Sequence, residues 1–119
     1  MNEYKFPRER WKQLTFIEQM GNIGAEVGRA IIAHRNGNEM RKTRAIDRAI
    51  DLFSATIEVN IGIAHSCRLR EVFRARDEFL RLFFDNTFDN DAANIERYFM
   101  DFAYIARAEK TKNKKSDGN

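Results

Sequence analysis

The spacing of apolar residues is the feature that most restricts the fold of this chain. Within residues 14–35, small or apolar residues recur at steps of three and four, at Ile17, Met20, Gly24, Val27 and Ile31, and His34 continues the same spacing. This period places them on one face of an α-helix rather than on alternate faces of a strand. The segment therefore predicts a helix with one side against a core.

Three later segments, over about residues 41–58, 67–84 and 92–108, repeat the pattern. Their predicted inward residues are Ala45, Ile46, Ala49, Ile50, Phe53 and Ile57, then Leu69, Val72, Phe73, Phe79, Leu80 and Phe83, then Ile95, Phe99, Phe102 and Ala106. No alternation typical of strands occurs. Four helices joined by short polar breaks predict an all-α fold, an antiparallel up-down-up-down four-helix bundle.

The breaks differ in how well they predict turns. Gly37, within Asn36-Gly37-Asn38, can take the left-handed conformation that closes a helix, and the polar run 85–91 offers turn residues and N-caps. Segment 60–66 is less polar than an exposed loop, so it can be a loop over the bundle end or a continuation of the second helix.

The chain of 119 residues is the size of one domain, with the bundle over residues 14–109. Residues 1–13 carry Tyr4, Phe6, Pro7 and Trp11, which predict an extended arm with aromatic anchors or a short lead-in to the first helix. Residues 110–119 lack apolar side chains and predict a disordered basic tail. The single cysteine and the absence of long apolar runs favour a cytoplasmic protein without a membrane segment.

Basic residues gather in three places, although 21 Lys and Arg against 18 Asp and Glu leave a net charge of only +3. Two basic helices and a cationic tail suit contacts with the phosphates of RNA or DNA. Self-neutralising ladders, such as Arg44 with Asp47, are the alternative. The candidate nucleic-acid-binding residues are Arg41, Lys42, Arg44, Arg48, Arg70, Arg74, Arg81, Lys110, Lys112, Lys114 and Lys115.

Glycines and surplus aromatic residues raise the question of self-association. Each glycine inside a helix costs about 1 kcal/mol relative to alanine, so a close backbone approach is expected there, either within the bundle or between subunits. Aromatic residues are also too many on the last two helices for all to point inward. The candidate oligomer-interface residues are Gly21, Gly24, Gly28, Phe84, Tyr98 and Tyr104.

The remaining motifs give little support for catalysis. Arg29 and His34 resemble the Arg-x4-His nuclease motif of the HEPN family, in which the histidine would move a proton and the arginine would stabilise an oxyanion. The alternative is a half-buried histidine at a helix end. His65 and Cys67 lack further ligands for zinc, so no metal, cofactor or catalytic residue is predicted.

Four motifs carry a family resemblance: residues 18–30 (EQMGNIGAEVGRA), 48–53 (RAIDLF), 69–77 (LREVFRARD) and 98–103 (YFMDFA). They resemble the small four-helix proteins that include the accessory variability protein of diversity-generating retroelements and the proteins encoded in rRNA intervening sequences. The resemblance implies a homopentamer of bundles with a basic surface that binds nucleic acid and, in the retroelement member, a reverse transcriptase. It implies no catalytic residue. We therefore expect a non-catalytic, oligomeric nucleic-acid-binding accessory protein, with a protein–protein scaffold as the alternative.

Overall fold

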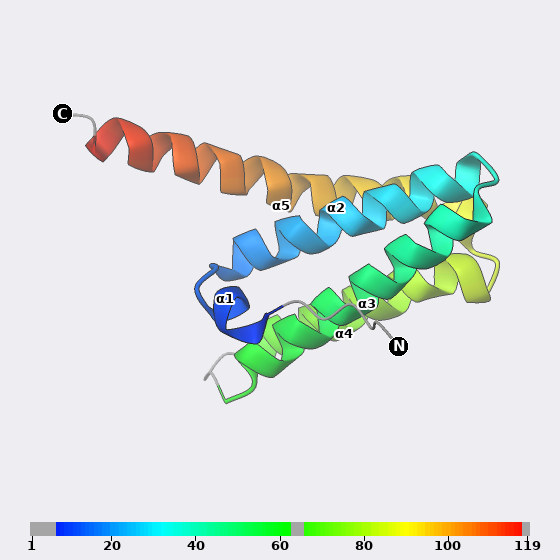
Figure 1. The fold of residues 1–119 in the computed structure, drawn as a ribbon, viewed down its shortest axis with the longest axis horizontal. Coiled ribbons are helices and arrows are strands. Elements are labelled where there is room, and N and C mark those ends of the chain that lie inside the picture. The colour runs from blue at the N-terminus through cyan, green and yellow to red at the C-terminus, as the bar shows by residue number, and fades with distance from the viewer. Residues whose placement is uncertain (1–6, 63–65, 118–119) are drawn as a thin grey trace.

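The described part of the chain is helical throughout, apart from turns. The structure, a computed structural model, describes residues 7–62 and 66–117, and these contain no strand. The helices are α1 (Arg8–Lys12), α2 (Phe16–Arg35), α3 (Glu39–Asn60), α4 (Ser66–Phe84) and α5 (Phe88–Asp117) (Figure 1). The all-α prediction is confirmed.

Local capping explains where α2 and α3 begin and why the turn between them is short. Thr15 and Glu18 form a reciprocal capping box at the start of α2. Gly37 has a φ of 69°, as predicted, and the Asn38 side chain accepts the Arg41 backbone N–H at the start of α3. The three residues 36–38 thus hold the end of α2 beside the start of α3.

Helix α2 packs against α3 and α5, and α4 packs against α3 and α5, while α1 packs against α3. Aromatic rings join these helices inside the core, where the Phe53 ring centroid lies 6.1 Å from those of both Phe79 and Phe99. Val27 and Ile31 of α2 are fully buried in the same cluster. The core therefore draws on every long helix.

Two predicted core residues are exposed, and those predictions were wrong. Ile50 is 38% exposed and Phe73 is 41% exposed, with the Arg76 guanidinium carbon 5.0 Å from the Phe73 ring centroid. Successive residues of a helix point about 100° apart, so a residue one place off the buried stripe faces solvent. Leu52 on α3 and Leu82 on α4 are buried instead.

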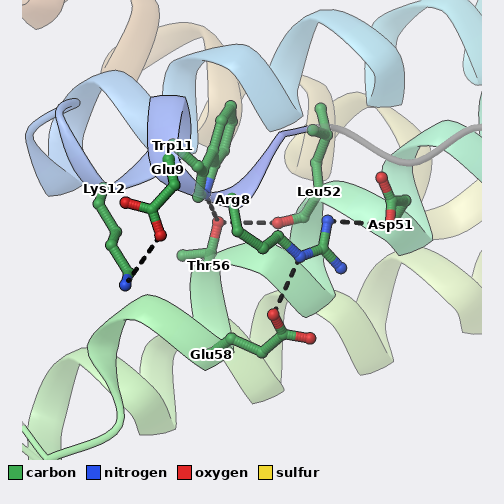
Figure 2. A network of polar contacts seen from close by, with 8 residues as sticks. All are labelled: Arg8, Glu9, Trp11, Lys12, Asp51, Leu52, Thr56 and Glu58. Carbon is green, nitrogen blue, oxygen red and sulfur yellow. Dashed lines mark hydrogen bonds and ion pairs between the residues drawn. The ribbon is translucent and has the colours of Figure 1, made fainter.

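The lead-in before α2 is a short helix anchored by one tryptophan (Figure 2). Trp11 is 1% exposed, and its Nε1–H donates to Thr56 Oγ1 of α3 at 2.9 Å. Arg8 donates to Asp51 at 3.1 Å and to Glu58 at 2.9 Å. The predicted anchors Tyr4 and Phe6 lie outside the described residues.

Two buried amides extend the contacts of α1 to α2. Gln19 donates to the Trp11 carbonyl at 3.1 Å, and Asn60 donates to Gln19 Oε1 at 3.1 Å and to the Thr56 carbonyl at 2.7 Å. Gln19, Thr56 and Asn60 are all less than 5% exposed. This polar cluster ties α1, α2 and α3 together at one end of the molecule.

Both ends of α5 differ from the prediction. It begins at Phe88 rather than near residue 92, because a turn at Asn86 (φ 58°) places Thr87 where its carbonyl accepts the Asp91 N–H. It continues to Asp117, where the sequence predicted an end at residue 108 and a disordered tail. Residues 109–117 contain no Gly or Pro, and Lys and Glu are good helix formers. The 60–66 segment divides: α3 ends at Asn60, and residues 63–65 lie outside the described residues.

Candidate nucleic-acid interface

Four arginines surround one cleft between the second half of α2 and the first half of α3. The cleft has a volume of about 430 Å³ and contains no carboxylate in its lining. We call it the arginine groove and define it by its lining residues Arg29, Ile32, Ala33, Asn36, Asn38, Arg41, Arg44, Ala45 and Arg48.

Helical spacing and the short turn bring these arginines together. Arg41, Arg44 and Arg48 follow one another at steps of three and four, so they lie along one side of α3. Arg29 and Ile32 are three positions apart on α2 and face the same cleft. Because residues 36–38 connect the two helices so closely, the two rows form opposite walls.

The arginines of the groove lie at the surface of the protein. All four arginines are exposed, and within residues 7–62 and 66–117 neither Arg41 nor Arg44 has an ion-pair partner. Arg29 Nη1 lies 2.7 Å from Glu26 Oε1, and that glutamate side chain is only 12% exposed. The Glu26 carboxylate therefore binds one nitrogen of the Arg29 guanidinium and leaves its remaining donors for an anion.

Lys42, predicted to act with these arginines, turns away from the groove. Its Nζ lies 2.9 Å from Glu39 Oε2 and 3.4 Å from His34 Nδ1, and its side chain is 16% exposed. It is also 6.0 Å from the Phe83 ring centroid. Lys42 thus contributes to packing between α3 and its neighbours.

The predicted arginines of α4 lie on another surface, where acidic side chains neutralise them. Arg70, Arg74 and Arg81 line a cleft of about 720 Å³ between α4 and α5 that also contains Glu71, Glu78 and Asp91. Arg74 pairs with Glu78 at 3.1 Å, and Arg81 pairs with Asp85 at 3.3 Å. Two of the three predicted arginines on α4 are thus paired with acidic side chains, and the arginines there offer a mixed rather than a basic surface.

Lys110 of α5 lies far from the arginine groove. Its Nζ is 3.9 Å from Glu18 Oε2, near the start of α2, whereas the groove lies near the end of that helix. Lys112 is exposed, and the side chains of Lys114 and Lys115 lie outside the described part of the structure. Of the predicted basic residues, Arg41, Arg44 and Arg48 share a cleft whose lining contains no carboxylate, and Arg29 of α2 lines it too.

The predicted oligomer-interface residues also separate into groups. A Cβ atom on Gly24 would lie 2.8 Å from Phe99 Cβ, so Gly24 allows α2 to approach α5 of the same chain. A Cβ atom on Gly21 would lie 3.5 Å from Ala103 Cα, an ordinary van der Waals contact with the same helix. Apart from the backbone of its own helix and its chain neighbours, no described atom lies within 4 Å of a Cβ placed on Gly28.

The aromatic candidates are more varied. Phe84 is 71% exposed and Tyr104 is 76% exposed. Tyr98 is half-buried and donates to Glu71 at 2.8 Å, and burial, together with this hydrogen bond, raises its pKa above the ordinary value. Phe84 and Tyr104 thus offer apolar surface to a partner, whereas Tyr98 joins α4 to α5.

Arg29 and His34 do not form a common site. Five helical positions turn them about 140° apart around α2. Arg29 lines the groove, while the His34 ring lies 4.0 Å from that of Phe88 and 5.6 Å from that of Phe83. His65 lies outside the described residues, and Cys67 is exposed. Across residues 7–62 and 66–117 no three potential metal ligands cluster.

No protein-family model, curated protein or solved structure matches this chain. Among the described helices, none combines the length and apolar character needed to cross a membrane.

Proposed function

We propose that this chain is a non-catalytic nucleic-acid-binding protein that holds phosphates in the arginine groove. The observation that carries the proposal is the convergence of four arginines on one cleft whose lining contains no carboxylate. A guanidinium presents several N–H donors in a plane and can bind a phosphate through two of them. Exposed, closely spaced arginines in a cleft whose lining contains no carboxylate suit a polyanion better than a neutral ligand.

The proposal extends to the assembly and its partner. We propose that α2 to α5 form an antiparallel up-down-up-down bundle, supported by the packing of each of these helices against two others. We further propose a homo-oligomer, a pentamer by resemblance, that serves a reverse transcriptase of a diversity-generating retroelement in the cytoplasm. Exposed Phe84 and Tyr104 supply apolar surface for such contacts.

Binding to a fluorescent 20-nucleotide strand, followed by anisotropy, tests the nucleic-acid proposal. With four arginines engaging about four phosphates, the affinity should fall roughly 50-fold between 50 and 200 mM salt. The double variant Arg41→Gln/Arg44→Gln should bind at least ten times more weakly at 100 mM salt. The matched control Arg74→Gln/Arg81→Gln removes the same charge from α4 and should lose less than threefold.

Two outcomes would overturn the proposal. No binding at either salt concentration would remove nucleic acid as the ligand. Equal losses in the two double variants would show that net charge, rather than the groove, attracts the strand.

A protein–protein scaffold is the second candidate, and the exposed apolar side chains of α5 favour it. Met100 is 64% exposed and Tyr104 76%, one turn apart on the same face. Sedimentation of the nuclease-treated protein tests this candidate. An oligomer that persists without nucleic acid and dissociates in Met100→Ser/Tyr104→Ser would support it, whereas a monomer would contradict both the scaffold and the proposed oligomer.

A further inference from the structure

An exposed apolar residue belongs to the lining of the arginine groove, where phosphate binding alone does not require one. Ile32 is 53% exposed and lies one turn after Arg29 on α2, in a lining that also includes three arginines of α3. Ala33 and Ala45, both buried, lie beside it in the same lining. The groove thus combines four arginines with apolar surface from Ile32 and the two alanines.

This combination fits a nucleotide whose base is not paired. In a duplex the bases are stacked and paired inside, and the outer surface presents phosphates and sugars. A single strand can turn a base outward, so that it contacts apolar side chains or the plane of an arginine while its phosphates meet cations. A groove lined by arginines together with Ile32, Ala33 and Ala45 offers both kinds of contact at once.

The size and shape of the cleft agree with this ligand. Its volume of about 430 Å³ lies within the usual range of pockets for small molecules, roughly 300–1,000 Å³. Because Arg29 comes from α2 and Arg41, Arg44 and Arg48 come from α3, both helices contribute cations to the groove. A duplex, which is convex and rigid, would reach only the rim.

We propose that the arginine groove selects single-stranded nucleic acid and accommodates one unpaired nucleotide, whose base lies over Ile32 while the arginines hold the neighbouring phosphates. This inference rests on the proposed function. It specifies the ligand class, a single strand of RNA or DNA, because the phosphates and the base are common to both.

The test compares three labelled probes with the full chain by fluorescence anisotropy at 100 mM salt. The probes are a 20-nucleotide single strand, the 20-base-pair duplex of the same sequence, and a single strand with alternate abasic sites, the first also prepared as RNA. We expect the intact single strand to bind at least ten times more tightly than the duplex and at least five times more tightly than the abasic strand.

Variants of two exposed apolar residues give a matched pair. Ile32→Ser should weaken binding of the intact strand three- to tenfold and leave duplex binding within twofold. Met40→Ser changes a side chain that is 64% exposed on the first turn of α3 and is absent from the groove lining, so it should change neither. Circular dichroism confirms that both variants are folded.

The outcomes separate this inference from the function on which it rests. Equal binding of single strand and duplex, or of intact and abasic strands, overturns the single-strand proposal and leaves phosphate binding intact. An unchanged affinity in Ile32→Ser also overturns it. Failure of the wild-type chain to bind any probe overturns the proposed function itself. The abasic comparison uses unmodified protein, so it decides the matter whatever the variants do.

Discussion

The hydroxyl of Thr56 joins α1 to α3 through a buried hydrogen bond. It accepts the Trp11 indole N–H at 2.9 Å and lies 2.8 Å from the Leu52 carbonyl, to which it donates (Figure 2). Thr56 is 0% exposed and Trp11 is 1% exposed, so water cannot replace either bond. We therefore predict that Thr56→Val destabilises the protein although valine has nearly the same shape.

The expected loss follows from the groups left behind. Valine removes the acceptor of the indole N–H in a site closed to water, and a buried donor that loses its acceptor costs about 1–3 kcal/mol. The Leu52 carbonyl keeps its helical position and loses only a second bond. We expect a decrease in the free energy of unfolding of about 2 kcal/mol. For a domain of this size that lowers the melting temperature by roughly 6–12 °C.

Urea unfolding followed by circular dichroism measures this loss, and an unchanged m-value would show that the denatured state is unaffected. Trp11 is the only tryptophan, so its fluorescence reports the detachment of α1 directly. The control is Thr56→Ser, which keeps the hydroxyl and loses one methyl group, at a cost of about 1 kcal/mol. The reasoning is refuted when Thr56→Val is as stable as the wild type, or more stable than Thr56→Ser.

Three further predictions concern packing, titration and backbone conformation. Gly24→Ala should lower the free energy of unfolding by about 1–3 kcal/mol, because the added Cβ would lie 2.8 Å from Phe99. Gly28→Ala should raise the free energy of unfolding by about 0.5–1 kcal/mol, because alanine favours a helix more than glycine does. Urea curves that reverse this order contradict the packing assignment. The pKa of Tyr98 is raised in the folded state above its unfolded value of about 10. Above pH 10 the unfolded state therefore loses this proton more readily than the folded state, so stability should fall as the pH rises through 10. This fall should be smaller in Tyr98→Phe. Replacement of Asn86, at φ 58°, by Ala should cost about 1 kcal/mol and by Gly almost nothing, and equal melting temperatures would disprove strain there.

Much of the fold follows from the three- and four-residue spacing of apolar side chains. That spacing located the four long helices, because burial of one face is what stabilises a helix of ordinary propensity in water. It could not locate α1, which is a single five-residue helix and shows no period. Trp11 was the available signal there, but its burial depends on Thr56, which is 45 positions away in the sequence.

The first and last residues of the helices were harder to predict, since capping and tertiary contacts decide where a helix begins and ends. The start of α5 depends on the turn at Asn86, and its end passes through a lysine-rich segment that composition alone predicts to be disordered. Thr111 Oγ1 donates to the Arg107 carbonyl within that segment, a local bond compatible with a continuing helix. Low apolar content therefore indicates a lack of core contacts rather than a lack of helix.

Part of the candidate site can be predicted from the sequence, because the positions of acidic residues relative to the arginines influence which arginines form ion pairs. Arg74 and Arg81 each have an acidic residue four positions ahead, and both pairs form on α4. Arg41 and Arg44 have alanine and arginine at that position. Asp47 lies three positions after Arg44, but within residues 7–62 and 66–117 neither arginine forms an ion pair. The i,i+4 rule thus separates the two basic helices that net charge treats alike. The i,i+4 rule does not predict that Arg29 belongs to the site, since only the packing of α2 beside α3 brings that residue to the same groove as the arginines of α3. A net charge of +3 therefore does not indicate whether this chain can bind an anion. The grouping of four arginines with apolar side chains in one cleft is the more informative feature.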